Sequence, residues 1–73
     1  MNLRAADSIY EQSRRAIIAR YGLPPELRRG WRVRTPDGRR GVIVGFRPDT
    51  IVCDVNGDIV AYSPDALDYT RER

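Results

Sequence analysis

Seven arginines between residues 28 and 48 are the side chains of this sequence best suited to bind a ligand: Arg28, Arg29, Arg32, Arg34, Arg39, Arg40 and Arg47. A guanidinium group holds a phosphate through two parallel hydrogen bonds, so clustered arginines are typical of surfaces that contact nucleic acid. Asp37 is the one acidic residue of this stretch, which leaves it a formal charge of +6. We predict that these arginines contact the phosphates of RNA or DNA, with Trp31, Phe46 or Tyr62 offering a ring on which a base stacks.

A second interpretation of the same arginines follows from the acidic segment behind them. Residues 49–70 contain five aspartates and no basic residue, a formal charge of −5. If the two segments form neighbouring antiparallel strands, arginines and aspartates can pair across the sheet, and exposed pairs of this kind contribute only about 0–1 kcal/mol each. The arginines are then a solvated charged face, and the sequence leaves both interpretations open.

Other chemistry is poorly represented in the sequence. The chain has no histidine and one cysteine, Cys53, which excludes a Cys–His zinc site and most forms of nucleophilic catalysis. Cys53 lies in the apolar run 50–55, so we expect a small buried side chain. The residues from Asp54 onward do not match the pattern of a calcium-binding loop, because Ile59 stands where such a loop needs glycine. We predict a protein that is not an enzyme and holds no metal or cofactor.

The segment before the arginines has the spacing of an amphipathic helix. Its apolar arc, repeating every three to four residues, contains Leu3, Ile9, Tyr10, Ile17 and Tyr21. We expect a helix that begins near Leu3, with Asn2 as cap, rather than at Ile9. It should end at Gly22, because glycine accepts the left-handed conformation that closes a helix and Pro24 and Pro25 prevent continuation.

After a connector at residues 24–30 the apolar period shortens to two, which predicts short strands at 31–35, 41–46, 51–55 and 58–62. The first strand places Trp31 and Val33 on one face and Arg32 and Arg34 on the other. The pair Asn56-Gly57 predicts a two-residue type I′ hairpin that aligns Val55 with Asp58, Cys53 with Val60 and Ile51 with Tyr62. One helical turn at 63–67, a brief strand at 68–70 and a frayed tail at 71–73 complete the chain.

Residues 30–69 resemble the SH3-like small barrels, and residues 30–46 resemble the KOW motif of that group. The resemblance depends on Gly30 before the first strand, the basic turn from Gly38 to Gly41, and the alternation of Val42 and Val44. It implies an α+β, mainly β fold: an N-terminal α-helix at 1–23, then a four- to five-stranded SH3-like (KOW-like) small barrel at 31–70, forming one domain. Related barrels bind RNA or other proteins. Phage and mobile-element genomes of GC-rich bacteria carry many such small chains, which suggests that origin.

The apolar face of the helix needs a cover. We expect the helix to dock on the outer face of its own barrel, where Val52, Ile59 and Ala61 form an apolar patch that Ile43 joins. The alternative cover is another protein or a second copy of the chain. The contacts would then be Leu3, Ile9, Tyr10, Ile17 and Tyr21, with Ile18 as a second contact on the other side of the helix.

The sequence thus leads to two hypotheses of different classes. The first is a non-enzymatic, nucleic-acid-associated accessory protein whose arginine-rich first hairpin contacts phosphates. The second is a protein-interaction or assembly module that uses the helix and the barrel edge. We expect no membrane partner and a cytoplasmic location, because no apolar stretch approaches the ~20 residues that span a bilayer and the first residues lack the apolar region of a signal peptide.

Overall fold

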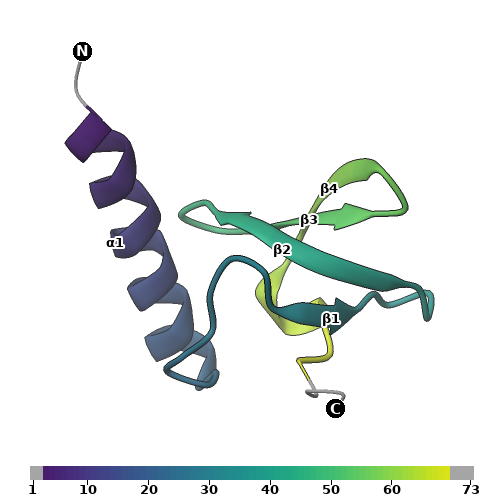
Figure 1. The fold of residues 1–73 in the computed structure, drawn as a ribbon. Helices are drawn as coiled ribbons and strands as arrows, with labels where there is room; N and C mark the ends of the chain where they lie inside the picture. Colours follow the sequence, from purple (N-terminus) through teal and green to yellow (C-terminus); the bar gives the residue numbers. More distant parts are fainter. Residues whose placement is uncertain (1–2, 70–73) are drawn as a thin grey trace.

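The protein forms one long helix followed by a four-stranded antiparallel sheet (Figure 1). The computed structural model describes the backbone of residues 3–69 and the side chains of residues 8–69. Helix α1 spans Leu3–Tyr21, and the strands are β1 (Arg32–Arg34), β2 (Arg40–Phe46), β3 (Ile51–Val55) and β4 (Asp58–Tyr62). A 3-10 turn, η1, covers Pro64–Ala66. The mainly β class with an N-terminal helix is therefore confirmed.

Helix α1 ends where the sequence predicts. Gly22 has a φ of 64°, and the Leu23 N–H donates to the Ile18 carbonyl oxygen at 3.1 Å, the hydrogen bond of a Schellman cap. Residues 3–8 are helical, so the later start at Ile9 is wrong and the longer helix is confirmed. The cap proposed for Asn2 lies outside the described residues.

The sheet has the order β1-β2-β3-β4 and is an antiparallel meander in which each strand pairs with the next. Asn56 and Gly57 have φ values of 54° and 88°, the left-handed geometry of a type I′ turn. The predicted register of β3 and β4 is confirmed, from Val55 opposite Asp58 to Ile51 opposite Tyr62. Of the expected fifth strand, the described residues contain one bridge, in which Asp68 and Arg34 exchange two backbone hydrogen bonds of 2.9 Å. Thr70 and the tail 71–73 lie outside the described residues.

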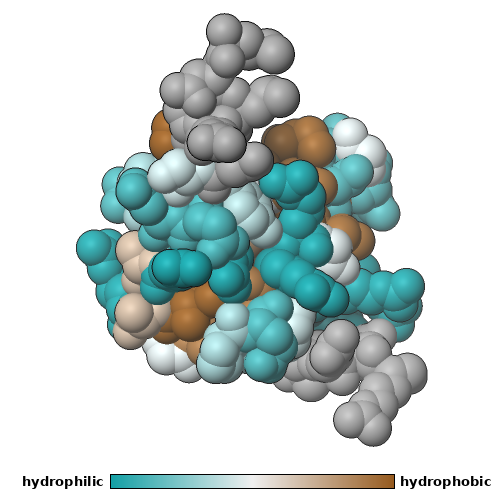
Figure 2. Space-filling model, turned by 60° about the vertical axis from the view of Figure 1, so that its left-hand side comes forward, coloured by the Kyte–Doolittle hydropathy of each residue, from teal (hydrophilic) through white to brown (hydrophobic). Residues whose placement is uncertain are grey.

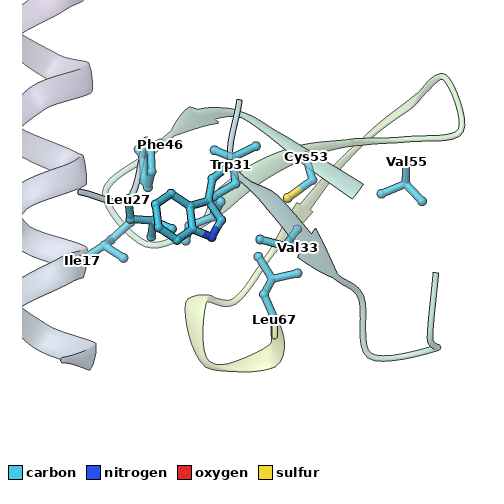
Figure 3. Packing of buried hydrophobic residues seen from close by; sticks show 10 residues of the cluster. Ile17, Leu27, Trp31, Val33, Phe46, Cys53, Val55 and Leu67 are labelled. Atoms are coloured by element: carbon cyan, nitrogen blue, oxygen red, sulfur yellow. The ribbon is translucent and has the colours of Figure 1, made fainter. Parts of the chain in front are cut away.

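The core lies between one face of the sheet, the helix and the connector. Figure 3 shows the Trp31 indole between Leu27 and Phe46 on the helix side and Val33 and Leu67 on the other. The fully buried side chains of this cluster include Leu27, Ile43, Ile51, Cys53 and Val55. Cys53 is thus the buried side chain that the apolar run 50–55 predicts, and the loss of solvation raises the pKa of its thiol to about 11.

Helix α1 docks within its own chain, but not on the predicted face. Ile17 is 2% exposed and points toward Leu27, and Tyr10 meets Phe46 edge to face with ring centroids 5.4 Å apart. The helix therefore packs against the end of β2 and against η1 rather than on the outer face of the sheet (Figure 1). Ile18 is a correction too, because it is partly buried against the core.

The alternation of β2 is also the reverse of the expected one. Ile43 is fully buried, whereas Val42 and Val44 are 38% and 36% exposed. The reason is Gly41, which pairs with Val33 and lies on the core face with its position for a Cβ only 3.1 Å from Val55. Inward positions on β2 therefore start at Gly41 and continue to Ile43, and the irregular register between Ile43 and Gly45 then places Phe46 in the core.

Candidate nucleic-acid interface

Arg32 and Arg34 project from the outer face of β1, as the alternation predicts. Both are exposed, while Val33 between them is 4% exposed and lies in the core. Two residues along a strand separate positions on one face by about 7 Å, so these arginines lie near each other. The strand thus divides its residues between a core side and a charged side.

Arg40 extends this charged surface onto β2. It is exposed and lies directly opposite Arg34 in the antiparallel register. The side chains of such a pair begin about 5 Å apart, and like charges in this position are unfavourable unless an anion or an acidic group lies beside them. The geometry therefore gathers Arg32, Arg34 and Arg40 on one patch of the sheet.

These three arginines line an open groove of about 670 Å³ at the end of the sheet where β1, the start of β2 and the β3–β4 turn lie. Its other lining residues are Val33, Gly41, Val42, Asp54, Asn56, Gly57 and Asp68. The second interpretation of the sequence expected aspartates of the later strands beside the arginines, and Asp54 fits it, whereas Asn56, Gly57 and Asp68 were not expected there. The signal for Asp54 was present, because the hairpin register places it with Ile59 on the outer face of the sheet.

The two aspartates of the groove have roles within the fold. Asp54 accepts the Gly57 N–H on Oδ1 at 2.9 Å and so closes the β3–β4 turn. Asp68 pairs with Arg34 through two backbone hydrogen bonds, which do not involve its carboxylate. Three arginines against two aspartates leave the groove with a formal charge of +1. Basic and acidic groups therefore share this surface rather than occupying opposite sides of the molecule.

Arg39 makes its hydrogen bonds within the turn between β1 and β2. Its Nε donates to Asp37 Oδ2 at 2.8 Å, and its backbone N–H donates to Thr35 Oγ1 at 3.0 Å. Thr35 Oγ1 in turn donates to Asp37 Oδ1. The hydrogen bond from Thr35 and the charge of Arg39 hold the pKa of Asp37 below its ordinary value. Arg39 thus has an ion-pair partner and does not line the groove.

The remaining predicted arginines lie elsewhere. The Arg29 guanidinium lies over the Tyr10 ring, 4.7 Å from its centroid, and its backbone N–H donates to the Tyr10 hydroxyl at 2.9 Å. Arg28 is exposed in the turn that precedes β1. Arg47 is exposed beyond the far end of β2, seven residues and about 23 Å of strand from Arg40. The structure therefore brings three of the seven arginines to the groove.

Trp31 does not lie on the surface. It is 9% exposed, and its Nε1–H donates to the Tyr69 carbonyl oxygen at 3.2 Å. The indole fills the core because Trp31 shares the inward phase of Val33. Its burial is incompatible with the stacking role that the sequence suggested.

The helix offers little apolar surface to a partner. Ile17 is buried, Tyr10, Ile18 and Tyr21 pack against the core, and Ile9 is 58% exposed. The side chain of Leu3 lies outside the described residues. Figure 2 looks at the helix side and shows mainly hydrophilic residues with separate hydrophobic patches between them. Exposed aliphatic side chains lie instead on the sheet, at Val42, Val44 and Ile59.

The described residues contain no group of three or more acidic, histidine or cysteine side chains arranged to hold a metal ion. Within the same part of the chain, no helix has the length and apolar character needed to cross a membrane.

Comparison of the chain with protein-family models, with curated proteins and with solved structures finds no match.

Proposed function

We propose that this protein is a non-enzymatic, nucleic-acid-associated accessory protein that holds backbone phosphates with Arg32, Arg34 and Arg40. The observation that carries the proposal is the arrangement of these three guanidinium groups around one open groove. Arg34 and Arg40 lie opposite each other on the two strands that border the groove, so both guanidinium groups are placed to meet one ligand there. Forked guanidinium groups suit phosphate oxygens, which they hold through paired hydrogen bonds.

The resemblance of residues 30–69 to SH3-like, KOW-like barrels supports the same proposal. Barrels of this group bind RNA or protein. We also propose that the sheet of this protein closes into a barrel of this kind. The bridge between Arg34 and Asp68 is in favour of closure, because it brings the chain after η1 back to the free edge of β1. We also propose an origin in a phage or mobile element, because such genomes carry many small chains of this kind.

The salt dependence of binding follows from the number of arginines that contact phosphates. For B-DNA each neutralised phosphate contributes about −0.9 to the slope of log K against log salt, so three contacts give about −2.7. Binding without sequence preference typically has a Kd of about 10⁻⁴ to 10⁻⁶ M at physiological salt. A small interface with a formal charge of +1 belongs at the weak end of this range, so low salt is the right condition for a test.

The experiment compares two arginines that differ only in position. Arg32→Gln removes a charge from the groove, and Arg47→Gln removes the same charge beyond the far end of β2. Fluorescence anisotropy with labelled DNA and RNA at about 50 mM salt should show weaker binding and a salt slope shallower by about 0.9 for Arg32→Gln alone. Equal losses in both variants would mean that net charge, not the groove, governs binding. No binding by the wild type at this salt would refute the proposal.

A second candidate function, a protein-interaction module, is favoured by one observation. Val42, Val44 and Ile59 are exposed on the outer face of the sheet, and the helix that was expected to cover this face packs elsewhere. Aliphatic side chains left exposed on one face of a sheet are typical of protein contacts. A pull-down from the native host tests this function. The result favours it if a protein partner or another copy of the chain stays bound after nuclease treatment and is lost in Ile59→Ser.

A further inference from the structure

The aromatic side chains of this protein are all used by the core. The chain has six, of which Trp31 and Phe46 are buried, and four are partly buried against the same cluster: Tyr10, Tyr21, Tyr62 and Tyr69. No aromatic residue falls among residues 1–7 or 70–73, whose side chains lie outside the described part of the chain. This account therefore covers every aromatic ring of the sequence.

Specific contacts hold several of these rings in place. The Trp31 Nε1–H donates to the Tyr69 carbonyl oxygen, and the Tyr69 hydroxyl donates to the Pro64 carbonyl oxygen. Tyr10 lies with its edge toward Phe46 and with the Arg29 guanidinium over its face. A ring that turned outward to meet a base would break these contacts and open the core.

Tyr62 is on the inner face as well. It pairs with Ile51, which is fully buried, and the outer face of β4 is formed instead by Ile59 and Ala61. The groove itself is lined by guanidinium, carboxylate, amide and aliphatic groups. A ligand on this face therefore meets charge and aliphatic surface, and it meets no ring.

This distribution discriminates between the two forms of nucleic acid. Proteins that bind single strands combine a basic groove with aromatic rings on which successive bases stack. A duplex keeps its bases stacked inside and presents phosphates at high density, so a surface can hold it through backbone contacts alone. We infer that the groove takes the sugar–phosphate backbone of a nucleic-acid duplex in preference to a single strand. This inference rests on the proposed function.

The size of the preference follows from the charge density of the two forms. Each phosphate contact contributes about 0.9 to the salt slope on a duplex and about 0.7 on a single strand, so three contacts differ by about 0.6. If the two forms bind equally at 1 M salt, where the electrostatic contribution vanishes, lowering the salt to 50 mM favours the duplex about sixfold.

The test uses the full chain and four fluorescein-labelled probes that contain equal numbers of nucleotides. The probes are a DNA duplex, an RNA duplex, and a DNA and an RNA single strand of unstructured sequence. Anisotropy titrations at 50 mM salt should give Kd values about sixfold lower for one or both duplexes than for the strands. Arg32→Gln should reduce this preference and Arg47→Gln should leave it unchanged. The duplex that binds more tightly identifies the preferred backbone.

Two results would overturn the inference while leaving the proposed function standing. One is single-strand binding as tight as duplex binding or tighter. The other is a loss of duplex binding in Tyr62→Leu when circular dichroism shows that the variant is folded like the wild type, because a ring would then belong to the contact surface. Absence of binding to all four probes would refute the proposed function itself.

Discussion

Arg14 joins helix α1 to the connector and provides the sharpest test of how this fold is held together. Its Nη1 donates to the carbonyl oxygens of Leu27 at 2.8 Å and Pro25 at 3.1 Å, and its Nε donates to Glu11 Oε1 at 3.0 Å. The side chain is only 17% exposed. Arg15 makes a pair with the same Glu11 at 3.2 Å, but its side chain is 78% exposed, and within the described residues it makes no hydrogen bond to the connector.

Replacing Arg14 by Met keeps the aliphatic length of the side chain and removes both hydrogen bonds to the connector. A hydrogen bond from a charged donor contributes about 1.5–3 kcal/mol when buried, and one of the two bonds is exposed, so we expect a loss of about 2 kcal/mol. A chain of 73 residues has a free energy of unfolding of about 4–11 kcal/mol. For a domain of this size the midpoint of thermal unfolding should fall by about 8–16 °C.

Arg15→Met is the matched control, because it removes the same charge and a pairing with the same glutamate. An exposed pair of this kind contributes little, so its unfolding midpoint should stay near that of the wild type. Circular dichroism at 222 nm during heating, together with urea denaturation, measures both variants. Equal midpoints for Arg14→Met and Arg15→Met would show that the hydrogen bonds to the connector do not stabilise the fold.

Three further predictions concern the hairpins and the core. Gly57→Ala should lower the free energy of unfolding by about 1–2 kcal/mol in urea denaturation, because φ is 88° at this position. Gly45→Ala is the control and should leave the free energy of unfolding unchanged, because a Cβ added there meets no atom within 4 Å. Equal effects of the two variants would contradict the turn argument. At pH 8 the thiol of Cys53 should react with a disulfide reagent only as the protein unfolds, since its pKa is raised to about 11, and reaction at the rate of a free thiol would show that it is accessible. The pKa of Asp37 in the folded protein lies below the unfolded value of about 3.9, so its contribution to stability is present above about pH 4 and is lost as the pH falls through the folded pKa. Thr35→Val should raise the Asp37 titration midpoint in a carboxyl NMR titration, and an unchanged midpoint would remove Thr35 as the main cause.

Features determined by a few neighbouring residues were predicted well. Glycine at position 22, followed by Leu23 and two prolines, predicts the end of α1, because only local backbone geometry is involved. Asn56 and Gly57 predict the register of β3 and β4 for the same reason, since a two-residue turn leaves one alignment of its strands.

Features that depend on distant packing were predicted poorly. The run Val42-Ile43-Val44 is apolar at every position, so a period of two cannot tell which residues face inward. Contact of Gly41 with Val55 decides the question, and that contact joins residues on different strands. The face covered by α1 could not be predicted either, because it depends on Leu27 and Phe46 filling the space between helix and sheet.

The candidate site was predictable in part, for the same reasons. Arg32 and Arg34 share a face by alternation alone, and the predicted hairpin brings Arg40 beside them. Arg39 was predicted to contact phosphates, but it pairs with Asp37, and this pair depends on the conformation of the turn and on the hydroxyl of Thr35. Trp31 was assigned two incompatible roles, as an inward residue of the first strand and as a base-stacking surface, and the structure bears out the first.

The arrangement of the sheet has a consequence for how its two faces respond to mutation. Helix, connector and η1 contribute to the core on one face, whereas the groove arginines project from the other. Val33 is buried and Arg32 is exposed on the same three-residue strand, so a change at Arg32 removes charge without opening a cavity. Arg34 and Arg40 differ from Arg32 because each has further interactions, with the Arg34 guanidinium donating to the Gly38 carbonyl oxygen at 3.2 Å. A substitution at Arg32 therefore separates binding from folding most cleanly, whereas one at Arg34 changes the turn and the groove together.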